Sequence, residues 1–288
     1  MPETHELARS FDEIARQYDS HAALEQEAGK RLLARTAFNR LEPARILDLG
    51  CGTGSGAAAL KKSFRKARIL ALDISATMLA EARRKAGLRR LFRLVRADMS
   101  RLPLSNQSVD MVFANLSTFW APDPEALFAE IRRVLRPEGM FLFTGFGPGT
   151  LRQLAEAGSQ TGGNIQIPVF PDLLETGDAL TAAGFREPVM DTERITLRYS
   201  RLDALMGELQ ATGTALLVRG WGRWKEQREG LELAYRPFLV EGQYPLSFEI
   251  VYGVAFGPPE GQPRRTAEGE VATFSVDSLL KSRSMGYS

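Results

Sequence analysis

Residues 46–57 read ILDLGCGTGSGA, in which four glycines stand at alternate positions directly after a short apolar run. Glycines, which have no Cβ atom, let the backbone approach a ligand closely. Gly52, Gly54 and Ala57 fit the G-x-G-x-x-G/A fingerprint of dinucleotide-binding loops, so a nicotinamide or flavin enzyme is one interpretation. Asp48, however, stands at the start of the same turn, where its carboxylate would repel a pyrophosphate. The loop alone leaves the ligand open between a dinucleotide and a cofactor without a pyrophosphate.

Acidic residues downstream decide between these ligands. Asp73 ends the apolar run ILALD, where a carboxylate can accept hydrogen bonds from both ribose hydroxyls of either cofactor. Asp98 follows the next apolar run and can accept from the exocyclic amine of an adenine, beside the backbone amide of Met99. Asp48 can attract an ammonium group, although bonding to backbone amides of the turn is its alternative role. Together the three carboxylates favour S-adenosylmethionine, whose methionine part carries an ammonium group.

The rest of the chain predicts an α/β fold. After Pro43, apolar runs alternate with amphipathic segments, which is typical of βαβ units and of a parallel sheet buried on both faces. A turn at Gly139, a helix stop at Gly184 and a short ordered piece around 271–280 are also expected. Predicted strands cover 45–49, 68–72, 91–97, 109–114, 140–146, 189–199 and 246–256; predicted helices cover 6–38, 55–64, 76–86, 124–135, 148–157, 172–183 and most of 201–240.

Four stretches, ILDLGCGTG, LALDIS, RADMSRLPLSNQSVDMVFANLSTFW and LFAEIRRVLRPEGMFLFTGF, resemble successive motifs of class I S-adenosylmethionine-dependent methyltransferases. This resemblance spans about residues 40–150. It implies a Rossmann-like, seven-stranded, mostly parallel sheet with an antiparallel last strand and the cofactor at the carboxyl ends of the first strands. The cofactor contacts that we expect are Asp48, Gly50, Gly52, Asp73, Ile74, Met78, Asp98, Met99 and Asn115.

A closer resemblance lies outside that core. FDEIARQYDSHAALEQEAGKRLL, LDALMGELQATGTALLVRG and GQYPLSFEIVYGVAFG resemble the malonyl-acyl-carrier-protein O-methyltransferases of biotin synthesis. Since that family methylates the free carboxylate of a malonyl thioester, the resemblance implies malonyl-acyl-carrier protein, an acidic protein partner, or malonyl-CoA as substrate. We expect an N-terminal helical cap at 1–40, an S-adenosylmethionine-binding core at 41–200, a helical substrate lid at 201–245, a final core strand at 246–257 and a tail at 258–288.

This chemistry needs orientation more than proton transfer. A carboxylate with a pKa near about 4 is already ionised at neutral pH, so no general base is required. The candidate catalytic residues are Tyr18 and Asn115. The resemblance places Tyr18 at the cofactor edge, where it can bond to the methionine carboxylate or the substrate, with an ordinary core position as its alternative, and Asn115 lies where the reacting methyl group is expected. A closing lid would exclude water. Candidates for substrate contact, two aromatic side chains for the acyl pocket and two arginines for the malonyl carboxylate, are Trp120, Phe170, Arg198 and Arg219. Plain core positions for the aromatic residues and surface positions for the arginines are the alternatives.

Charge is unevenly distributed. The chain carries a net charge of +2, yet residues 61–101 hold thirteen Lys or Arg side chains against three Asp or Glu side chains. Such a stretch is either a set of solvated surfaces or a surface that attracts an acidic macromolecule. For the carrier protein we prefer the basic side chains of the insertion, since the substrate arm must reach the lid. They are Arg219, Arg223, Lys225 and Arg228.

Composition and motifs argue against several other classes. The first twenty residues are charged throughout and no run approaches the roughly 20 apolar residues of a membrane span, so a cytoplasmic protein without a membrane partner is expected. The single cysteine, Cys51, excludes an internal disulfide, and neither it nor His5 or His21 has metal-ligand spacing. Residues 114–117 read ANLS rather than an N-P-P-Y-like base-flipping tetrapeptide, so no nucleic-acid partner is expected. A methyltransferase of another small carboxylic acid or quinone precursor, a nucleic-acid binder and a pseudo-enzyme stay as alternatives, and the oligomeric state stays open.

Overall fold

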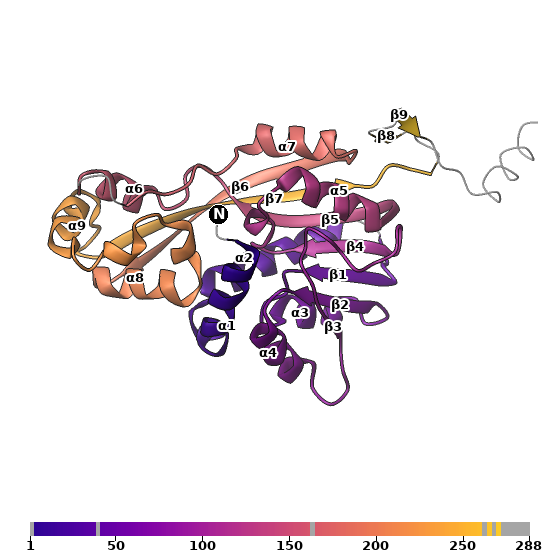
Figure 1. The fold of residues 1–288 in the computed structure, drawn as a ribbon, viewed down its shortest axis with the longest axis horizontal. Coiled ribbons are helices and arrows are strands. Elements are labelled where there is room, and N and C mark those ends of the chain that lie inside the picture. Colours follow the sequence, from indigo (N-terminus) through magenta and orange to yellow (C-terminus); the bar gives the residue numbers. More distant parts are fainter. Residues whose placement is uncertain (1–2, 39–40, 162–164, 261–263, 267–268, 272–288) are drawn as a thin grey trace, which may run out of the picture.

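The computed structural model describes residues 3–38, 41–161, 165–260, 264–266 and 269–271. Its strands are β1 (Arg45–Leu49), β2 (Arg68–Asp73), β3 (Arg93–Arg96), β4 (Val109–Ala114), β5 (Leu135–Phe146), β6 (Arg186–Tyr199), β7 (Tyr244–Phe256), β8 (Arg264–Thr266) and β9 (Gly269–Val271). The first seven form one sheet in the order β3-β2-β1-β4-β5-β7-β6, while β8 and β9 pair with each other (Figure 1).

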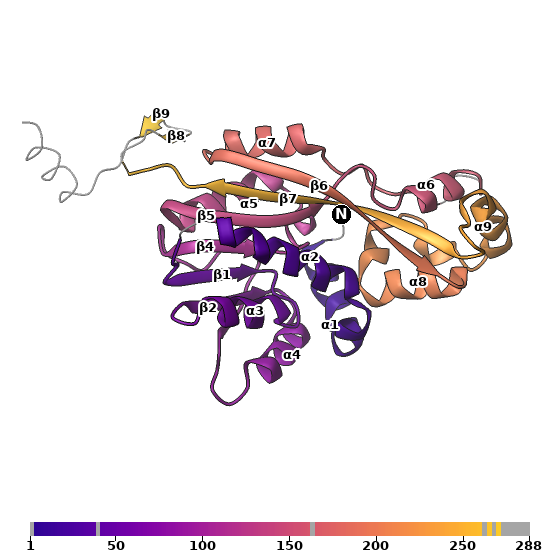
Figure 2. The ribbon, with the colours of Figure 1, turned by 180° about the vertical axis from the view of Figure 1, so that it is seen from behind.

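Helices cover both faces of the seven-stranded sheet. They are α1 (Thr4–His21), α2 (Ala23–Ala34), α3 (Ser55–Ser63), α4 (Ala76–Ala86), α5 (Pro124–Val134), α6 (Arg152–Ser159), α7 (Leu173–Ala182), α8 (Leu202–Ala211) and α9 (Arg228–Tyr235). Short 3-10 turns are η1 (Arg35–Phe38), η2 (Thr118–Trp120), η3 (Thr214–Leu217), η4 (Trp221–Arg223) and η5 (Arg236–Phe238). Figure 2 shows α2 and α3 in front of the sheet, on the face away from α5.

Side chains that alternate along the strands pack into two separate hydrophobic cores, one on each face of the sheet. Ile46 of β1 packs with Leu32 of α2 and Leu60 of α3, whereas the next residue, Leu47, packs with Leu127 of α5 on the other face. All five leucine and isoleucine side chains named here are fully buried. Successive strand residues point to opposite faces, so the continuous apolar runs of the sequence are what a sheet covered on both sides requires.

The strand directions confirm the predicted Rossmann-like topology. β1 pairs in parallel with β2 and β4, and the β2–β3 and β4–β5 pairs are also parallel. β7 runs antiparallel to both of its neighbours, β5 and β6. The last strand of the sheet is therefore the antiparallel one, as the sequence predicts.

Some predicted boundaries were wrong. The helical region predicted over 6–38 is broken at Ala22, whose backbone leaves the helical conformation (φ −83°, ψ 40°) between α1 and α2. β5 begins at Leu135 instead of residue 140, and Gly139 lies within it, where a Cβ atom would come within 3.0 Å of the Asp110 carbonyl oxygen. The predicted stop at Gly184 is confirmed, with a positive φ of 83°.

The helix predicted over 148–157 starts later, at Arg152. Residues 147–151 turn first because β7 holds them: the amides of Gly147 and Gly149 donate 2.8 Å hydrogen bonds to the Glu249 carbonyl and carboxylate, respectively. The piece predicted around 271–280 lies outside the described residues, except for Val271 in β9.

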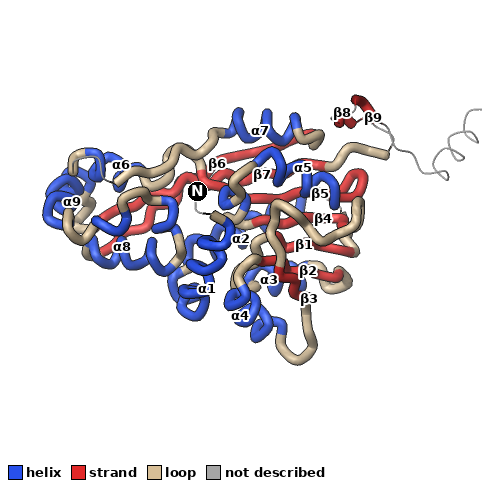
Figure 3. Tube along the Cα trace, viewed as in Figure 1, coloured by secondary structure: helices blue, strands red, loops and turns tan. Residues whose placement is uncertain are grey.

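β6 and β7 extend beyond the other strands, and α6, α8 and α9 gather around their far end (Figure 3). α8 and α9 belong to the segment between these two strands, and Tyr235 of α9 donates a 2.7 Å hydrogen bond from its hydroxyl to the Pro245 carbonyl. Within the described part of the chain, no helix combines the length and the apolar character needed to cross a membrane.

Candidate active site

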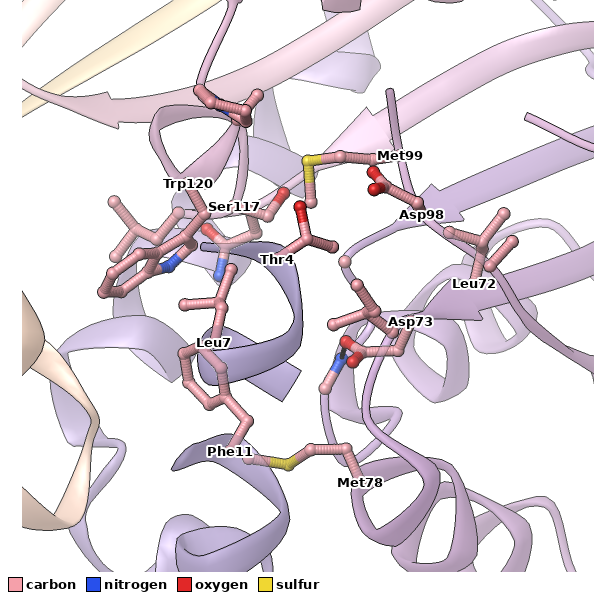
Figure 4. Close-up of a pocket in the computed structure, with 18 of the residues that line it drawn as sticks. Thr4, Leu7, Phe11, Leu72, Asp73, Met78, Asp98, Met99, Ser117 and Trp120 are labelled. Carbon is pink, nitrogen blue, oxygen red and sulfur yellow. Dashed lines mark hydrogen bonds between the residues drawn. The ribbon is translucent and has the colours of Figure 1, made fainter. Parts of the chain in front are cut away.

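The carboxyl ends of β1, β2 and β4 open onto a pocket that α1 helps to enclose. Figure 4 shows Asp73 and Asp98 on one side of this pocket and Trp120 on the other. Eight of the nine predicted cofactor residues line it: Gly50, Gly52, Asp73, Ile74, Met78, Asp98, Met99 and Asn115. We call this space the first compartment.

Asp73, the last residue of β2, fixes the glycine loop. Its Oδ2 accepts a 2.8 Å hydrogen bond from the Gly52 amide, and its Oδ1 accepts one of 2.9 Å from the Ser75 amide. Burial raises the pKa of Asp73 from its ordinary value, although these backbone amides act in the opposite direction. The carboxylate is thus held in one orientation at the pocket wall.

The glycines of the loop leave room for a ligand. Gly50 has a positive φ of 70°, and a Cβ atom there would stand 2.4 Å from the Ser117 Cβ, so no other residue fits. A Cβ atom on Gly52 would instead meet nothing within 4 Å among the described residues. The backbone of Gly52 therefore borders open space, as a cradle for a bound group must.

Asp98 turns the chain after β3. Its Oδ1 accepts hydrogen bonds from the Ser100 amide at 2.8 Å and from the Ser100 hydroxyl at 2.7 Å. This local turn holds Asp98 and the neighbouring Met99 against the pocket, where both were expected to border an adenine.

α1 is fastened across the pocket by two carboxylates. Asp12 accepts hydrogen bonds from the Ser75 hydroxyl at 2.6 Å and the Thr77 amide at 2.8 Å, at the N-terminus of α4. Burial raises the pKa of Asp12, but these hydrogen bonds outweigh it and leave the pKa below its ordinary value. Asp19 accepts a 2.6 Å hydrogen bond from the Thr53 hydroxyl of the loop. Tyr18 is thereby placed over the pocket.

Asp48 lies in a second compartment, lined mainly by α2, α3 and the glycine loop. It is 2% exposed, and its Oδ2 has no hydrogen-bond partner among the described residues. Burial, and to a lesser extent the charge of Asp73, raises the pKa of Asp48 to about 7, although a hydrogen bond from the Ala57 backbone amide lowers it. Tyr18, Gly50, Gly52 and Asn115 line both compartments, so the two spaces meet at these residues.

Asn115 joins three elements at this meeting point. Its Nδ2 donates a 2.8 Å hydrogen bond to the Glu25 carbonyl of α2, and its Oδ1 accepts one of 2.8 Å from the Thr144 hydroxyl of β5. Both ends of the amide are therefore used within the protein. Asn115 lies where the reacting methyl group is expected and also ties α2 to the sheet.

A methyltransferase domain family matches residues 47–143, which contain the glycine loop, Asp73, Asp98 and Asn115. The malonyl-acyl-carrier-protein O-methyltransferase of Laribacter hongkongensis is 40% identical over 89% of this chain and 90% of its own length. The enzyme of the same name from Halorhodospira halophila is 38% identical over 96% of this chain and 95% of its own. The chain belongs to the malonyl-acyl-carrier-protein O-methyltransferase family.

The fold of this family member has relatives among solved structures. The YcgJ protein of Bacillus subtilis superimposes with a TM-score of 0.58 at 15% identity, covering 79% of this chain and 97% of that one. At such low identity the likeness concerns the fold alone.

The structure separates the two aromatic residues predicted to line the acyl pocket of this methyltransferase. Trp120 lines the first compartment and meets Phe11 of α1 edge-to-face, with 5.5 Å between ring centroids. Phe170 lines neither compartment; it is buried against Phe146 and Phe119, with ring centroids at 5.4 and 6.2 Å. A chain of aromatic rings, Trp120, Phe119 and Phe170, links the two positions.

The predicted arginines lie on the surface and line neither compartment. Arg198 is half-exposed and approaches Glu241 at 3.6 Å, while Arg219 is exposed and pairs through its backbone with Gln166. Arg228 contacts Asp203 at 2.9 Å. Part of the basic stretch lies elsewhere: Lys61, Lys66, Arg68, Arg89, Arg90 and Arg93, together with Arg45, line a groove at the amino ends of β1, β2 and β3, away from the pocket.

Sequence reasoning missed several residues at the pocket. Thr4, Leu7 and Phe11 line it together with Tyr18, and their spacing of three, four and seven residues places them on one face of α1. That periodicity could have identified them. Glu25, in the second compartment, was also missed, and nothing in its sequence context distinguishes it from its neighbour Glu27.

Proposed function

We propose that this protein transfers the methyl group of S-adenosylmethionine to the free carboxylate of a malonyl group carried as a thioester by acyl carrier protein. Membership of the malonyl-acyl-carrier-protein O-methyltransferase family, with relatives matched over nearly their whole length, is the observation that supports the substrate most directly. The methyltransferase domain match and the two neighbouring compartments, which share four lining residues, support the cofactor.

The residues present fit S-adenosylmethionine. Asp73 and Asp98 would accept hydrogen bonds from the ribose hydroxyls and the adenine amine in the first compartment. Asp48, with its unpartnered buried oxygen, would receive the methionine ammonium in the second. When bound, the cofactor supplies an electrophilic methyl group on a positively charged sulfur.

The protein's own residues would act by position and charge. Burial, together with the charges of Glu25, Asp73 and Asp19, raises the pKa of Tyr18 well above its ordinary value. The hydroxyl therefore stays protonated and can donate to an anionic oxygen, and Tyr18 and Asn115 both border the meeting point of the compartments. The malonyl carboxylate is ionised at neutral pH, so holding it near about 3 Å from the methyl group with little water is the main requirement.

The substrate side carries three further proposals. Trp120 and Phe170 would bound the acyl chain through the row of aromatic rings, and the helical segment 201–245 would close over it as a lid. Arg198 or Arg219 would reach the malonyl carboxylate only if that lid moved, because both are exposed in the present arrangement.

The decisive experiment offers one labelled methyl donor and several acceptors. Purified protein with labelled S-adenosylmethionine is given malonyl-acyl-carrier protein, malonyl-CoA or bulk RNA in separate reactions. We expect label in the malonyl thioester, with the carrier-protein form preferred. Label found only in RNA would overturn the proposal. If malonyl-CoA is methylated equally well, the carrier protein is no longer part of the proposal.

The variants Tyr18→Phe, Asn115→Ala and Arg198→Ala would then be compared by kcat/KM. A residue whose replacement leaves this catalytic efficiency unchanged has no part in substrate binding.

A further inference from the structure

We propose that Glu25 of α2, together with Asp48, receives the ammonium group of the cofactor's methionine part. This inference rests on the proposed cofactor but not on the proposed methyl acceptor. It adds to the site a residue from the N-terminal helices that no motif of the methyltransferase core contains.

The division of the pocket locates the two ends of the cofactor. Asp73 and Asp98 line only the first compartment, whereas Glu25 and Asp48 line only the second. In S-adenosylmethionine the sulfur joins the nucleoside to the amino acid. If the nucleoside lies by Asp73 and Asp98, the sulfur lies at the meeting point and the amino-acid end enters the second compartment.

Glu25 has a buried carboxylate oxygen that no other group of the described residues satisfies. Its backbone carbonyl is fixed by Asn115 at 2.8 Å, which holds this turn of α2 over the meeting point. Its carboxylate Oε2 is buried and has no hydrogen-bond partner among the described residues. A buried carboxylate oxygen without a donor is costly, unless a bound group satisfies it.

Charges around the second compartment point to a cation as that group. Its lining contains two basic side chains among the described residues, and both already face carboxylates: Lys85 contacts Asp19 at 2.7 Å, and Lys30 approaches Glu27 at 3.8 Å. Asp19 is used in turn by Lys85 and Thr53. Glu25 and Asp48 are the lining carboxylates left with an unpartnered oxygen, and each can accept from an ammonium group.

The groups that face Glu25 make its charge depend on that cation. These groups are Tyr18 from α1, Glu208 from α8 and Tyr199 from β6. The Tyr199 hydroxyl donates a 2.8 Å hydrogen bond to the Glu208 carboxylate. Burial first, and then the charge of Glu208, raises the pKa of Glu25 to about 7. With no cation bound, Glu25 is partly protonated near neutral pH. Arrival of an ammonium group favours the ionised form and releases the proton to solvent.

Three probes distinguish this role by calorimetric titration: S-adenosylmethionine, S-adenosylhomocysteine and 5′-methylthioadenosine. The first two carry the ammonium group, and the third lacks the whole amino-acid part. We expect Glu25→Gln, which keeps the size of the side chain but not its charge, to weaken binding of the first two by about tenfold. Binding of 5′-methylthioadenosine should change less than twofold, and Glu27→Gln on the same helix should leave all three affinities unchanged.

Proton release gives a second measurement, made on the unmodified protein. Titrations of S-adenosylhomocysteine at neutral pH in two buffers of different ionisation enthalpy should show release of protons, and those of 5′-methylthioadenosine should show much less. Equal release with both ligands, or a Glu25→Gln variant that keeps its affinity for S-adenosylhomocysteine, overturns the role of Glu25. An equal loss for all three ligands also overturns it, because that indicates a general structural defect. If the unmodified protein binds neither S-adenosylmethionine nor S-adenosylhomocysteine, the proposed function itself fails.

Discussion

Thr53 in the glycine loop donates a 2.6 Å hydrogen bond from its hydroxyl to Asp19, on the last turn of α1. Lys85 of α4 reaches the other oxygen of the same carboxylate at 2.7 Å. Asp12, two turns earlier on α1, accepts from Ser75 and Thr77. The helix that carries Tyr18 is thus joined to the cofactor-binding loops on both sides of the pocket, and the loops and the helix should form and loosen together.

Replacing Asp19 tests this coupling. Asp19→Ala removes both bonds at this end of α1, and we expect the affinity for S-adenosylhomocysteine to fall by about threefold to tenfold. Calorimetric titration measures the loss. Glu13→Ala, which removes an exposed carboxylate from the same helix, is the matched control and should bind normally. Normal binding by Asp19→Ala would show that α1 does not position the loop.

Asp73→Asn should have a larger effect. Both carboxylate oxygens accept backbone hydrogen bonds, from Gly52 and Ser75, and an amide can accept only on its oxygen. One buried amide loses its partner and the loop loses its anchor, so we expect cofactor affinity to fall about 30-fold or more. Asp178→Asn, on the exposed surface of α7, is the control. An affinity within twofold of the unmodified protein would contradict this prediction.

The core of the fold could be predicted because its determinants are local. The buried runs 45–49 and 109–114 and the helix 76–86 are bounded by turn residues and have the boundaries predicted from the sequence. Residues 148–151 were predicted as helix and instead turn because Glu249, about 100 residues away, holds the amides of Gly147 and Gly149. Such long-range bonds leave no local pattern.

The candidate site likewise contains residues that the local sequence identifies and one residue that it does not. Asp48, Asp73 and Asp98 could be assigned to the candidate site because each lies near the carboxyl end of a strand in a recognisable motif. Glu25 could not, since its significance comes from the burial of its carboxylate and from a missing hydrogen-bond partner, which only the packed structure determines.

The raised pKa of Asp48 predicts an unusual dependence of stability on pH. Asp48 lies near Asp73 and Cys51, neither of which carries a positive charge that would stabilise its ionised form. Burial raises the pKa of Asp48 to about 7 in the folded protein, compared with about 3.9 in an unfolded chain. Between these values the folded state keeps a proton that the unfolded state loses. The stabilising contribution is therefore complete below about pH 4 and is lost as pH rises toward about 7.

Asp48→Asn removes this titration while the amide oxygen can still accept from Ala57. The Tm of the variant, relative to the unmodified protein without ligand, should be higher at about pH 7.5 than at about pH 5. Thermal denaturation of both proteins at the two pH values measures the difference, and other titrating groups cancel in the comparison. A difference in Tm that is the same at both pH values would show that Asp48 titrates normally.

The last prediction concerns the two basic surfaces. If the carrier protein docks on the insertion, Arg223→Glu combined with Lys225→Glu should raise KM for malonyl-acyl-carrier protein by about fivefold at low salt, and added salt should reduce the effect. Both side chains are exposed, and neither lines either compartment of the pocket. Arg65→Glu with Lys66→Glu, in the basic stretch at the amino ends of the strands, is the matched control, because the carrier's substrate arm cannot easily reach the pocket from there. Malonyl-pantetheine, which lacks a protein surface, should be methylated equally by all three proteins. A rise in KM confined to the control pair would move the docking surface to the groove beside β1, β2 and β3.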